Sequence, residues 1–263
     1  MTSTPDPDLA DLRAVAVEAA RAGARALEPF VRDRAELEVE AKSANDFVTR
    51  ADLASERAIS EVLRARFPDH RILGEEEEGG ESLGGGVPLW VVDPLDGTTN
   101  FIRGFPMYAV SVACTLEGRA VAGAVIDVAR DELFEASRGG GAFCRGRVLR
   151  ASGRAGLQGA LIATGFPFRR RHRTEAFLAS FRSVFSRVAD VRRAGAAAID
   201  LASVAAGRLD GFWEEGLGPW DIAAGGLLVE EAGGVVSDFQ GGGDHLRTGA
   251  VVAAGPGVHE PGQ

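Results

Sequence analysis

Two aspartates three residues apart, Asp93 and Asp96, have the residue type and spacing to bind a metal ion. Both carboxylates can ligate the same hard cation, and the backbone carbonyl of Leu95 between them can supply a further oxygen. The small and hydroxyl-bearing residues of the segment DGTTN, residues 96–100, favour phosphate as well as metal. Taken alone, DPLD is more often a solvated turn than a metal site.

The sequence around these aspartates predicts a rigid support for them. Residues 89–92 are continuously apolar between two prolines and rich in β-branched and aromatic side chains, which indicates a short strand buried on both faces. Pro94 fixes φ, and Gly97 permits backbone angles that a side chain would forbid. We therefore expect Asp93 to end the strand and residues 93–99 to form a sharply turned loop.

Three motifs, in this order along the chain, resemble those of the inositol monophosphatase family of magnesium-dependent, lithium-sensitive phosphatases. The motifs are Gly74-Glu75-Glu76, Asp93 to Phe101, and Trp220-Asp221-Ile222-Ala223-Ala224-Gly225. The likeness extends from about Asp8 to the end of the chain. It implies a layered α/β (α+β) fold, an alternating helix and sheet sandwich of the inositol monophosphatase and fructose-1,6-bisphosphatase type.

The resemblance implies two metal positions built from four acidic residues. Glu75, Asp93 and the Leu95 carbonyl would hold one cation. Asp93, as a bridge, would hold the other together with Asp96 and Asp221. Oxygen ligation without His or Cys selects Mg²⁺, with Mn²⁺ as the other option, over zinc. We expect two or three Mg²⁺ ions.

The expected catalytic residues are Glu75, Thr98 and Asp52. By resemblance, Glu75 and Thr98 orient a metal-activated water for in-line attack on a phosphomonoester, and Asp52 holds Thr98. The spacing of Thr49 and Asp52 also matches a helix capping box, a structural role compatible with the first. The backbone N–H groups of Gly97 and Thr98 are expected to cradle phosphate oxygens.

Substrate contacts follow from the same resemblance. The small residues Gly195, Ala196 and Ala197 would leave room for a sugar ring. Glu214 could accept hydrogen bonds from the hydroxyls of that ring. The alternatives are structural: the small residues could begin a helix, and Glu214 could be a charged residue at the end of a strand. The substrate-binding residues that the resemblance implies are Asp96, Gly97, Thr98, Gly195, Ala196, Ala197, Glu214 and Asp221.

The implied activity is that of a phosphoric monoester hydrolase acting on inositol 1-phosphate or a similar sugar or polyol monophosphate. The alternative within the superfamily is a histidinol-phosphate phosphatase or a fructose-1,6-bisphosphatase. A different class of function rests on the basic run Phe168 to Arg173, which could bind RNA or a partner protein. No aromatic stacking platform accompanies the run, so we expect an exposed loop without contacts and no nucleic-acid partner.

Composition restricts the remaining choices. The 263 residues carry a net charge of −9, which disfavours a general nucleic-acid or membrane binder and means that an anionic substrate needs cations to approach. Cys114 and Cys144 are too few for a disulfide framework. The first residues lack the features of a signal peptide, and no apolar run is long enough to span a bilayer. We expect a soluble cytoplasmic protein and, by resemblance, a homodimer.

We expect a single domain over residues 1–263, with a metal-binding lobe at about 8–155 and a second lobe at about 156–258. An N-terminal helix is predicted with Asp6 as its cap and Pro29 at its end, and Asp221 is predicted to cap a later helix. An antiparallel meander is predicted between residues 108 and 151. The glycine-rich segment 79–86 is consistent equally with a flap over the site and with an ordinary surface loop.

Overall fold

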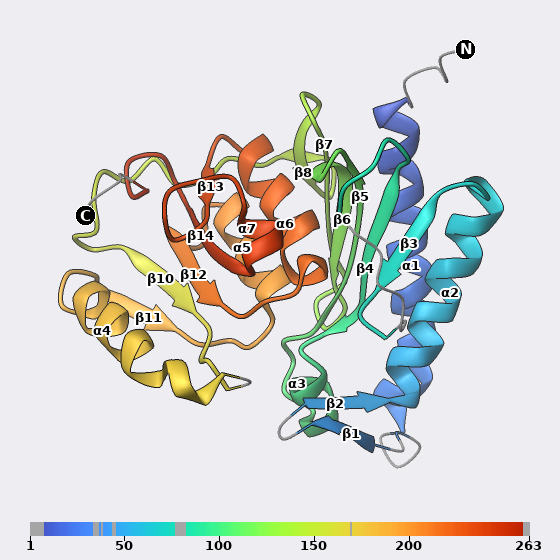
Figure 1. Ribbon diagram of the computed structural model, residues 1–263, viewed down its shortest axis with the longest axis horizontal. Helices are drawn as coiled ribbons and strands as arrows, with labels where there is room; N and C mark the ends of the chain where they lie inside the picture. Colours follow the sequence, from blue (N-terminus) through green and yellow to red (C-terminus); the bar gives the residue numbers. More distant parts are fainter. Residues whose placement is uncertain are drawn as a thin grey trace.

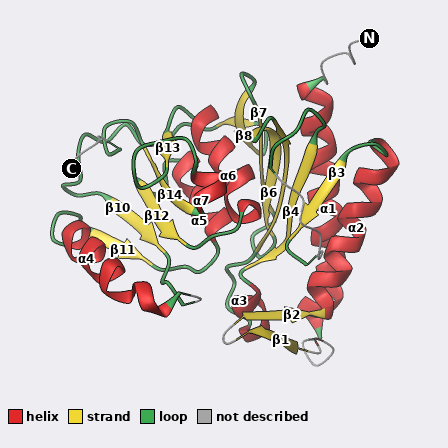
Figure 2. Cartoon of the chain, in the orientation of Figure 1, coloured by secondary structure: helices red, strands yellow, loops and turns green. Residues whose placement is uncertain are grey.

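Helices and β-sheets alternate in layers along the longest axis of the molecule (Figure 1). The computed structural model describes residues 8–33, 37, 39–43, 46–76, 83–168 and 170–259. Residues 79–82 of the predicted flap at 79–86 lie outside these residues. In the described part, a seven-stranded and a five-stranded sheet enclose a pair of helices, and further helices cover their outer faces (Figure 2). The predicted layered α/β fold is therefore confirmed.

The seven-stranded sheet has the order β3-β4-β5-β6-β7-β8-β9. Its strands are β3 (Arg71–Gly74), β4 (Leu89–Asp96), β5 (Ala109–Leu116), β6 (Arg119–Asp127), β7 (Glu132–Ser137), β8 (Gly141–Cys144) and β9 (Arg147–Val148). The strands from β4 onward pair antiparallel, which confirms the predicted meander. By contrast, β3 and β4 are parallel and pair Gly74 with Val92, so Glu75 leaves the sheet beside Asp93.

The prediction that Asp93 ends a strand is wrong, because β4 continues to Asp96. Asp93 pairs with Ser111 and Asp96 pairs with Ala109, so β4 advances three residues while β5 advances two. This extra residue is a β-bulge, and the bulge follows from Pro94, which has no N–H to donate to the neighbouring strand. The sharp turn that we expected is thus built into the end of the strand.

Two long helices cover the outer face of this sheet. The first, α1 (Leu9–Arg32), begins two residues later than predicted, because the Asp8 carboxylate caps it by accepting from the Ala10 N–H at 2.9 Å. Pro29 does not end the helix as predicted. Its carbonyl still accepts from the Asp33 N–H at 3.0 Å, so the last turn of α1 continues past the proline to Arg32.

The second helix, α2 (Arg50–Arg66), starts at the predicted capping box. The Thr49 hydroxyl accepts from the Ala51 N–H at 3.1 Å, and the Asp52 carboxylate accepts from the Thr49 N–H at 2.8 Å. A two-stranded hairpin of β1 (Val39–Ser43) and β2 (Asp46–Thr49) leads into this cap. The start of α2 is therefore fixed next to the short helix α3 (Thr98–Arg103), which β2 contacts.

The five-stranded sheet has the order β11-β10-β12-β14-β13. Its strands are β10 (Leu161–Thr164), β11 (Asp190–Arg192), β12 (Gly211–Glu215), β13 (Val235–Ser237) and β14 (Ala250–Ala254). Because β10 is parallel to both β11 and β12, the chain leaves all three strands at the same edge. Their carboxyl ends supply one side of the site described below.

Small residues let two helices fill the space between the sheets. These helices are α5 (Ala197–Ala205) and α6 (Pro219–Glu231), which pack against each other and against both sheets. A Cβ on Gly225 would lie 2.6 Å from the Leu201 Cβ, so glycine is needed for this close approach. Further helices in the described residues are the 3₁₀ turn η2 (Arg171–Arg173), α4 (Thr174–Phe185) on the far side of the smaller sheet, and α7 (His245–Thr248).

Within the described residues, no helix combines the length and apolarity that a crossing of the bilayer requires.

Candidate metal and phosphate site

One pocket of about 440 Å³ lies where the carboxyl ends of strands from both sheets meet. The larger sheet contributes the residues after β3 and the bulge of β4, and the smaller sheet contributes the loops after β10, β11 and β12. Its charged lining residues are Glu75, Asp93, Asp96, Arg103, Arg170, Arg171, Arg193, Glu214, Glu215 and Asp221. The pocket therefore has carboxylates and guanidinium groups in its wall.

The acidic cluster predicted from the sequence is present in this pocket. Asp93, Asp96 and Asp221 each offer an oxygen, and these atoms all lie within 4.8 Å of one another. All three side chains are buried. Glu75 lines the same pocket and lies close enough to raise the pKa of Asp93. Four carboxylates from three distant segments thus converge.

Backbone N–H groups hold one oxygen of each clustered carboxylate. Asp93 accepts from the Leu95 N–H at 3.0 Å, and Asp96 accepts from the Ala198 N–H at 2.8 Å in the first turn of α5. Asp221 accepts from the Gly218 N–H at 2.6 Å. The predicted cap role of Asp221 is corrected here, because Gly218 is the N-cap and Asp221 is the third residue of α6. This capping box needs a carboxylate that reaches back, which Asp at the third position provides.

The donor set and the electrostatics fit a divalent cation. The second oxygen of Asp93, Oδ2, is buried and has no hydrogen-bond partner in the described part of the chain. Burial raises the pKa of Asp93 well above its usual value, and three neighbouring carboxylates, first among them Glu75, raise it further. A hard cation would satisfy the orphaned oxygen and cancel this repulsion.

Thr98 connects the acidic cluster to α2. Its hydroxyl lies 3.1 Å from the Asp52 carboxylate and 3.0 Å from the Leu95 carbonyl, so its single proton can be donated to either. Burial raises the pKa of Asp52 to about 6, while hydrogen bonds from Thr49 and Thr98 oppose that rise. The structure thus brings together the predicted pair of Thr98 and Asp52.

The turn after Asp96 has a backbone shape that depends on glycine. Gly97 has a φ of 87°, and a Cβ added to it would lie 2.8 Å from the Met107 carbonyl oxygen. Asn100 belongs to the DGTTN segment, but its role could not be read from the sequence. It ties this turn to the smaller sheet. Its side-chain N–H groups donate to the carbonyls of Met107 at 2.8 Å and Ala194 at 3.0 Å.

The predicted substrate contacts are placed in the pocket with one exception. Gly195, Ala197 and Glu214 line it, but Ala196 does not, and its side chain is only 1% exposed. Ala196 packs beneath Gly97 instead, because the buried side of the turn needs a small neighbour. Burial and the nearby Asp221 raise the pKa of Glu214 to about 8.

Sequence analysis also missed most of the positive side of the pocket. Arg193, from the loop after β11, lies 5.2 Å from the Phe166 ring centre and 6.0 Å from that of Phe168. Arg170 and Arg171 of the basic run line the same pocket. The expectation that this run lacks contacts is wrong. The run comes to the pocket because it follows β10, a placement that local sequence does not reveal.

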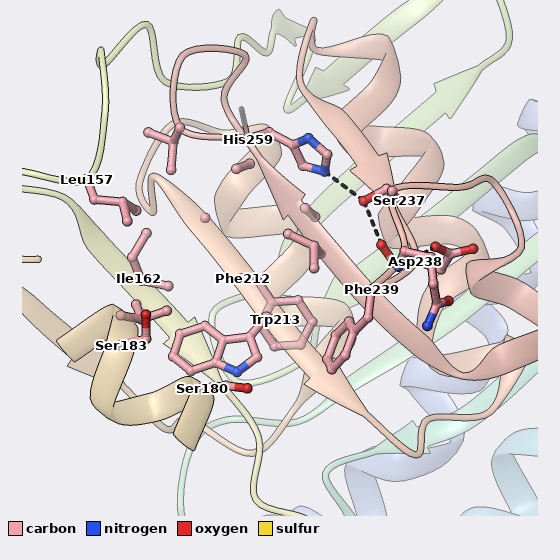
Figure 3. Close-up of a pocket in the computed structure, with 18 residues that line it drawn as sticks. Leu157, Ile162, Ser180, Ser183, Phe212, Trp213, Ser237, Asp238, Phe239 and His259 are labelled. Carbon is pink, nitrogen blue, oxygen red and sulfur yellow. Dashed lines mark hydrogen bonds between the residues drawn. The ribbon is translucent and has the colours of Figure 1, made fainter. Parts of the chain in front are cut away.

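A second hollow of about 580 Å³ lies on the outer face of the smaller sheet (Figure 3). Its floor includes Ile162 and Trp213, and the Ser237 hydroxyl at its rim lies 2.9 Å from the His259 ring. Its lining carboxylate, Asp238, already accepts from backbone N–H groups, among them that of Gly242 at 2.8 Å. These hydrogen bonds close the loop that follows Asp238. The residues that line this hollow do not include a carboxylate cluster like that in the first pocket.

Known proteins resemble the chain over nearly its full length. Nus factor SuhB of Pseudomonas aeruginosa is 50% identical over 242 residues, which make up 91% of this chain and 89% of the relative. The crystal structure of extragenic suppressor protein suhB from Bartonella henselae superposes with a TM-score of 0.86 at 42% identity, covering 93% of both chains. The structure of inositol monophosphatase from Anabaena superposes with a TM-score of 0.82 at 36% identity, covering 95% of this chain and 92% of that one.

The sequence model of one family spans the fold and the acidic pocket together. It is described as the inositol monophosphatase family, and it matches residues 8–262. The match includes Glu75, the bulge of β4 and Asp221, so the segments that converge in space also fall within one family pattern. The chain therefore belongs to the inositol monophosphatase family, a family of phosphatases.

Proposed function

We propose that this protein is a Mg²⁺-dependent phosphomonoesterase that hydrolyses inositol 1-phosphate or a similar sugar or polyol monophosphate. The observation that carries the proposal is the convergence of Asp93, Asp96 and Asp221, with ligand atoms within 4.8 Å of one another, beside Glu75. An all-carboxylate cluster with an orphaned buried oxygen suits a hard divalent cation.

The residues that would hold the cations are Glu75, Asp93, Asp96, Asp221 and the carbonyl of Leu95. When bound, such cations lower the pKa of a water and neutralise charge on the phosphoryl group. Glu75 would orient the attacking water together with the Thr98 hydroxyl. Asp52 would fix that hydroxyl from behind through the 3.1 Å contact. Positioning of this kind supplies much of the acceleration in phosphoryl transfer.

The remaining pocket residues would hold the substrate. The backbone N–H groups of Gly97 and Thr98 lie at the turn that follows Asp96 and would donate to phosphate oxygens. Glu214, with a pKa of about 8, keeps its proton at neutral pH. Its carboxyl can therefore donate to one polyol hydroxyl and accept from another. Gly195 and Ala197 leave room for the ring beside it.

A phosphate-release panel tests the proposal. The substrates are inositol 1-phosphate, histidinol phosphate, fructose 1,6-bisphosphate and a nucleoside monophosphate, each with Mg²⁺, with Mg²⁺ and lithium, and with excess EDTA. We expect inositol 1-phosphate to be hydrolysed, lithium to inhibit the reaction and EDTA to abolish it. Full activity in EDTA would refute the metal-dependent mechanism. A strong preference for histidinol phosphate would assign the alternative substrate.

The proposal also covers the domain organisation, the cellular location and the number of subunits. We propose one domain with lobes at about 8–155 and 156–258, a cytoplasmic location and a homodimer. The division at 155 falls between β9 of the larger sheet and β10 of the smaller one, which supports it. Light scattering after size-exclusion chromatography measures the subunit number, and a monomer at micromolar concentration would refute the dimer.

A binding role is the second candidate function. The Pseudomonas aeruginosa relative, at 50% identity, is named Nus factor SuhB. The basic run offers a positive surface for an RNA or protein partner, although Arg173 within it pairs with Glu215 at 3.1 Å. The variant Asp93→Asn separates the two functions, because it should abolish hydrolysis and spare binding of a fluorescent single-stranded RNA.

A further inference from the structure

The hollow on the outer face of the smaller sheet has no role in the hydrolysis proposed above. Its volume of about 580 Å³ falls within the roughly 300–1,000 Å³ typical of sites for small organic molecules. Trp213 of β12 and Val252 of β14 line it from the sheet, and Ser183 and Val184 line it from α4 (Figure 3). The space stays open because α4 covers the sheet incompletely, with none of its 12 residues buried.

Trp213 faces this hollow and not the acidic pocket. Successive residues of a strand point to opposite faces of the sheet. Phe212 packs into the core between the two sheets, whereas Trp213 packs with Ile162 in a separate small cluster on the side of α4. Glu214, the next residue, lines the acidic pocket. The sheet therefore separates the two cavities, and a ligand in the hollow leaves the acidic pocket free.

Trp213 also brings an unused hydrogen-bond donor to the hollow. The side chain is only 8% exposed, and its indole Nε1 is buried without a hydrogen-bond partner in the described part of the chain. Two hydroxyl groups of the lining, by contrast, already donate: Ser180 to the Ala176 carbonyl at 3.3 Å, and Ser237 to the Asp238 carbonyl at 2.9 Å. A buried donor without an acceptor costs free energy, so a ligand that supplies the acceptor is favoured.

The charge of the lining disfavours an anionic ligand. Asp238 lines the hollow, and no Lys or Arg is among the described lining residues. Backbone hydrogen bonds, first that from Gly242, hold the pKa of Asp238 below its usual value, so this carboxylate is ionised at neutral pH. One of its oxygens already accepts from the N–H groups of Gln240 and Gly242 at 2.8 Å each, so it does not need a cationic partner. A neutral ligand suits these surroundings best.

We propose that the hollow binds a neutral, flat heteroaromatic molecule whose ring nitrogen or carbonyl oxygen accepts a hydrogen bond from the indole N–H of Trp213. The ring of Phe239, which also lines the hollow and is exposed, favours an aromatic ligand, because offset or edge-to-face ring pairs gain energy beyond burial alone. The inference does not depend on the proposed hydrolysis, since no residue of the acidic pocket takes part in it.

A matched pair of ligands tests the inference on the full chain. Quinoline and naphthalene have the same shape, but quinoline has a ring nitrogen that accepts a hydrogen bond in place of one C–H group. Saturation-transfer NMR with both ligands at equal concentration, at pH 8 where quinoline is neutral, compares their affinities. We expect quinoline to bind about 5-fold more tightly, which is the scale of one net hydrogen bond. A hollow without a free donor would prefer naphthalene, which loses less hydration on burial.

The indole N–H signals of the protein identify the donor directly. The chain has three tryptophans, so the spectrum of the ¹⁵N-labelled protein contains three indole signals. We expect quinoline to shift the signal of Trp213 and to leave the other two in place. Trp220 is the matched control, because its Nε1 is also buried without a partner in the described residues, but Trp220 does not line the hollow. Trp90 already donates to the His70 ring at 3.1 Å.

Three variants localise the binding. Trp213→Phe keeps an aromatic ring and removes the N–H group, so the order of affinity should reverse in favour of naphthalene. Ser183→Trp places a large side chain at an exposed position of α4 that lines the hollow, so the affinity for both ligands should fall by about 10-fold or more. Leu178→Trp is the control, because Leu178 is exposed on the same helix outside the lining, and it should leave both affinities unchanged.

The unmodified protein alone can overturn the inference. It fails if naphthalene binds as tightly as quinoline, if neither ligand binds, or if the Trp213 signal does not move. It also fails if Ser183→Trp weakens binding no more than Leu178→Trp does, because quinoline would then occupy another place. Phosphate release is not part of these measurements, so a failure of the proposed function would leave the result for the hollow intact.

Discussion

The two sides of the pocket differ in how firmly they are built. On the acidic side, Asp93 is only 1% exposed, and backbone N–H groups hold one oxygen each of Asp93, Asp96 and Asp221. Arginines and aromatic rings also line the pocket, and we call Phe166, Phe168, Arg170, Arg171 and Arg193 the arginine wall. On this wall, Arg170 and Arg193 are exposed and are held mainly by packing against rings and backbone. The acidic side therefore has a fixed geometry, whereas the wall can adjust to a ligand.

This difference matches two tasks. In-line displacement needs the reacting groups in one geometry, which a buried and hydrogen-bonded cluster provides. Recognition of the rest of the substrate tolerates adjustment, because a long arginine side chain can move with the group that it binds. The fixed side has an energetic cost, since like charges are buried together and raise the pKa of Asp93. Folding of the metal-free protein should be weakened by this cluster.

The largest effect is expected from Asp93→Asn. This change removes the carboxylate with the orphaned oxygen, so kcat/KM on inositol 1-phosphate should fall by about 10³-fold or more, equivalent to roughly 4 kcal/mol of transition-state stabilisation. In EDTA the same variant should melt at a higher temperature than the unmodified protein, because one buried charge is gone. Phosphate release and thermal unfolding measure the two effects.

Asp190→Asn is the control for this prediction. Asp190 is exposed and pairs with Arg192 outside the pocket, so its replacement should change neither quantity appreciably. A variant of Asp93 that stays active, or that melts lower in EDTA, would show that the cluster is not a strained metal site.

A smaller effect is expected from Thr98→Val. The variant keeps the shape of the side chain and removes the hydroxyl that links Asp52 to the Leu95 carbonyl. We expect kcat to fall by about 10²-fold, the usual scale for a positioned group that acts on the nucleophile. Thr98→Ser retains the hydroxyl and should recover most of the rate. Equal losses in both variants would contradict a role for the hydroxyl.

The contrast between the two sides also explains what the sequence could predict. The acidic motifs are short and local, and the strands and capping box that position them follow from residue periodicity and from the pair Thr49 and Asp52. The arginine wall has no such local signature. Arg193 and Arg170 are 23 residues apart and line one pocket because β10 and β11 are parallel neighbours.

The errors at the acidic side have the same origin. Residue type predicts Asp221 as a helix cap, but the preceding Gly218 and Pro219 already provide the start of α6. The family resemblance predicts Ala196 as a substrate contact, but its packing beneath Gly97 depends on a contact across 99 positions of sequence. Contacts of this length are set by how the sheets pack, so they escape an analysis of neighbouring residues.

Glycine variants measure the rigidity of the two sides directly. Gly97 and Gly195 both have positive φ, at 87° and 86°, so alanine costs roughly 1 kcal/mol of backbone strain at either position. At Gly97 the new Cβ would also meet the Met107 carbonyl oxygen at 2.8 Å, whereas at Gly195 it meets the movable end of Arg193. Gly97→Ala should therefore lower the free energy of unfolding by about 1–2 kcal/mol more than Gly195→Ala.

Urea unfolding in EDTA compares the two variants, and Gly139→Ala supplies the baseline. Gly139 has a φ of 71° and nothing within 4 Å of an added Cβ, so it reports backbone strain alone. If Gly195→Ala is the more destabilising of the pair, the arginine wall is the rigid side and the comparison is reversed.

The smallest effect is expected at Glu214, where the two sides meet. Burial and Asp221 raise its pKa from 4.5 to about 8, and Arg193 opposes the rise. The folded state thus retains a proton that the unfolded chain releases, so stability contributed by this group is present below pH 4.5 and is lost as the pH rises through 8. In EDTA, Glu214→Gln should remove the pH dependence of the free energy of unfolding that comes from this group, about 1–2 kcal/mol after screening in the open pocket.

Arg193→Gln should enlarge the same pH dependence, because the cation that opposes the rise in the pKa of Glu214 is lost. Urea unfolding at pH 5, 7 and 9 measures both changes, and a Glu214→Gln variant with an unaltered pH profile would show that this carboxyl is ionised in the folded protein throughout.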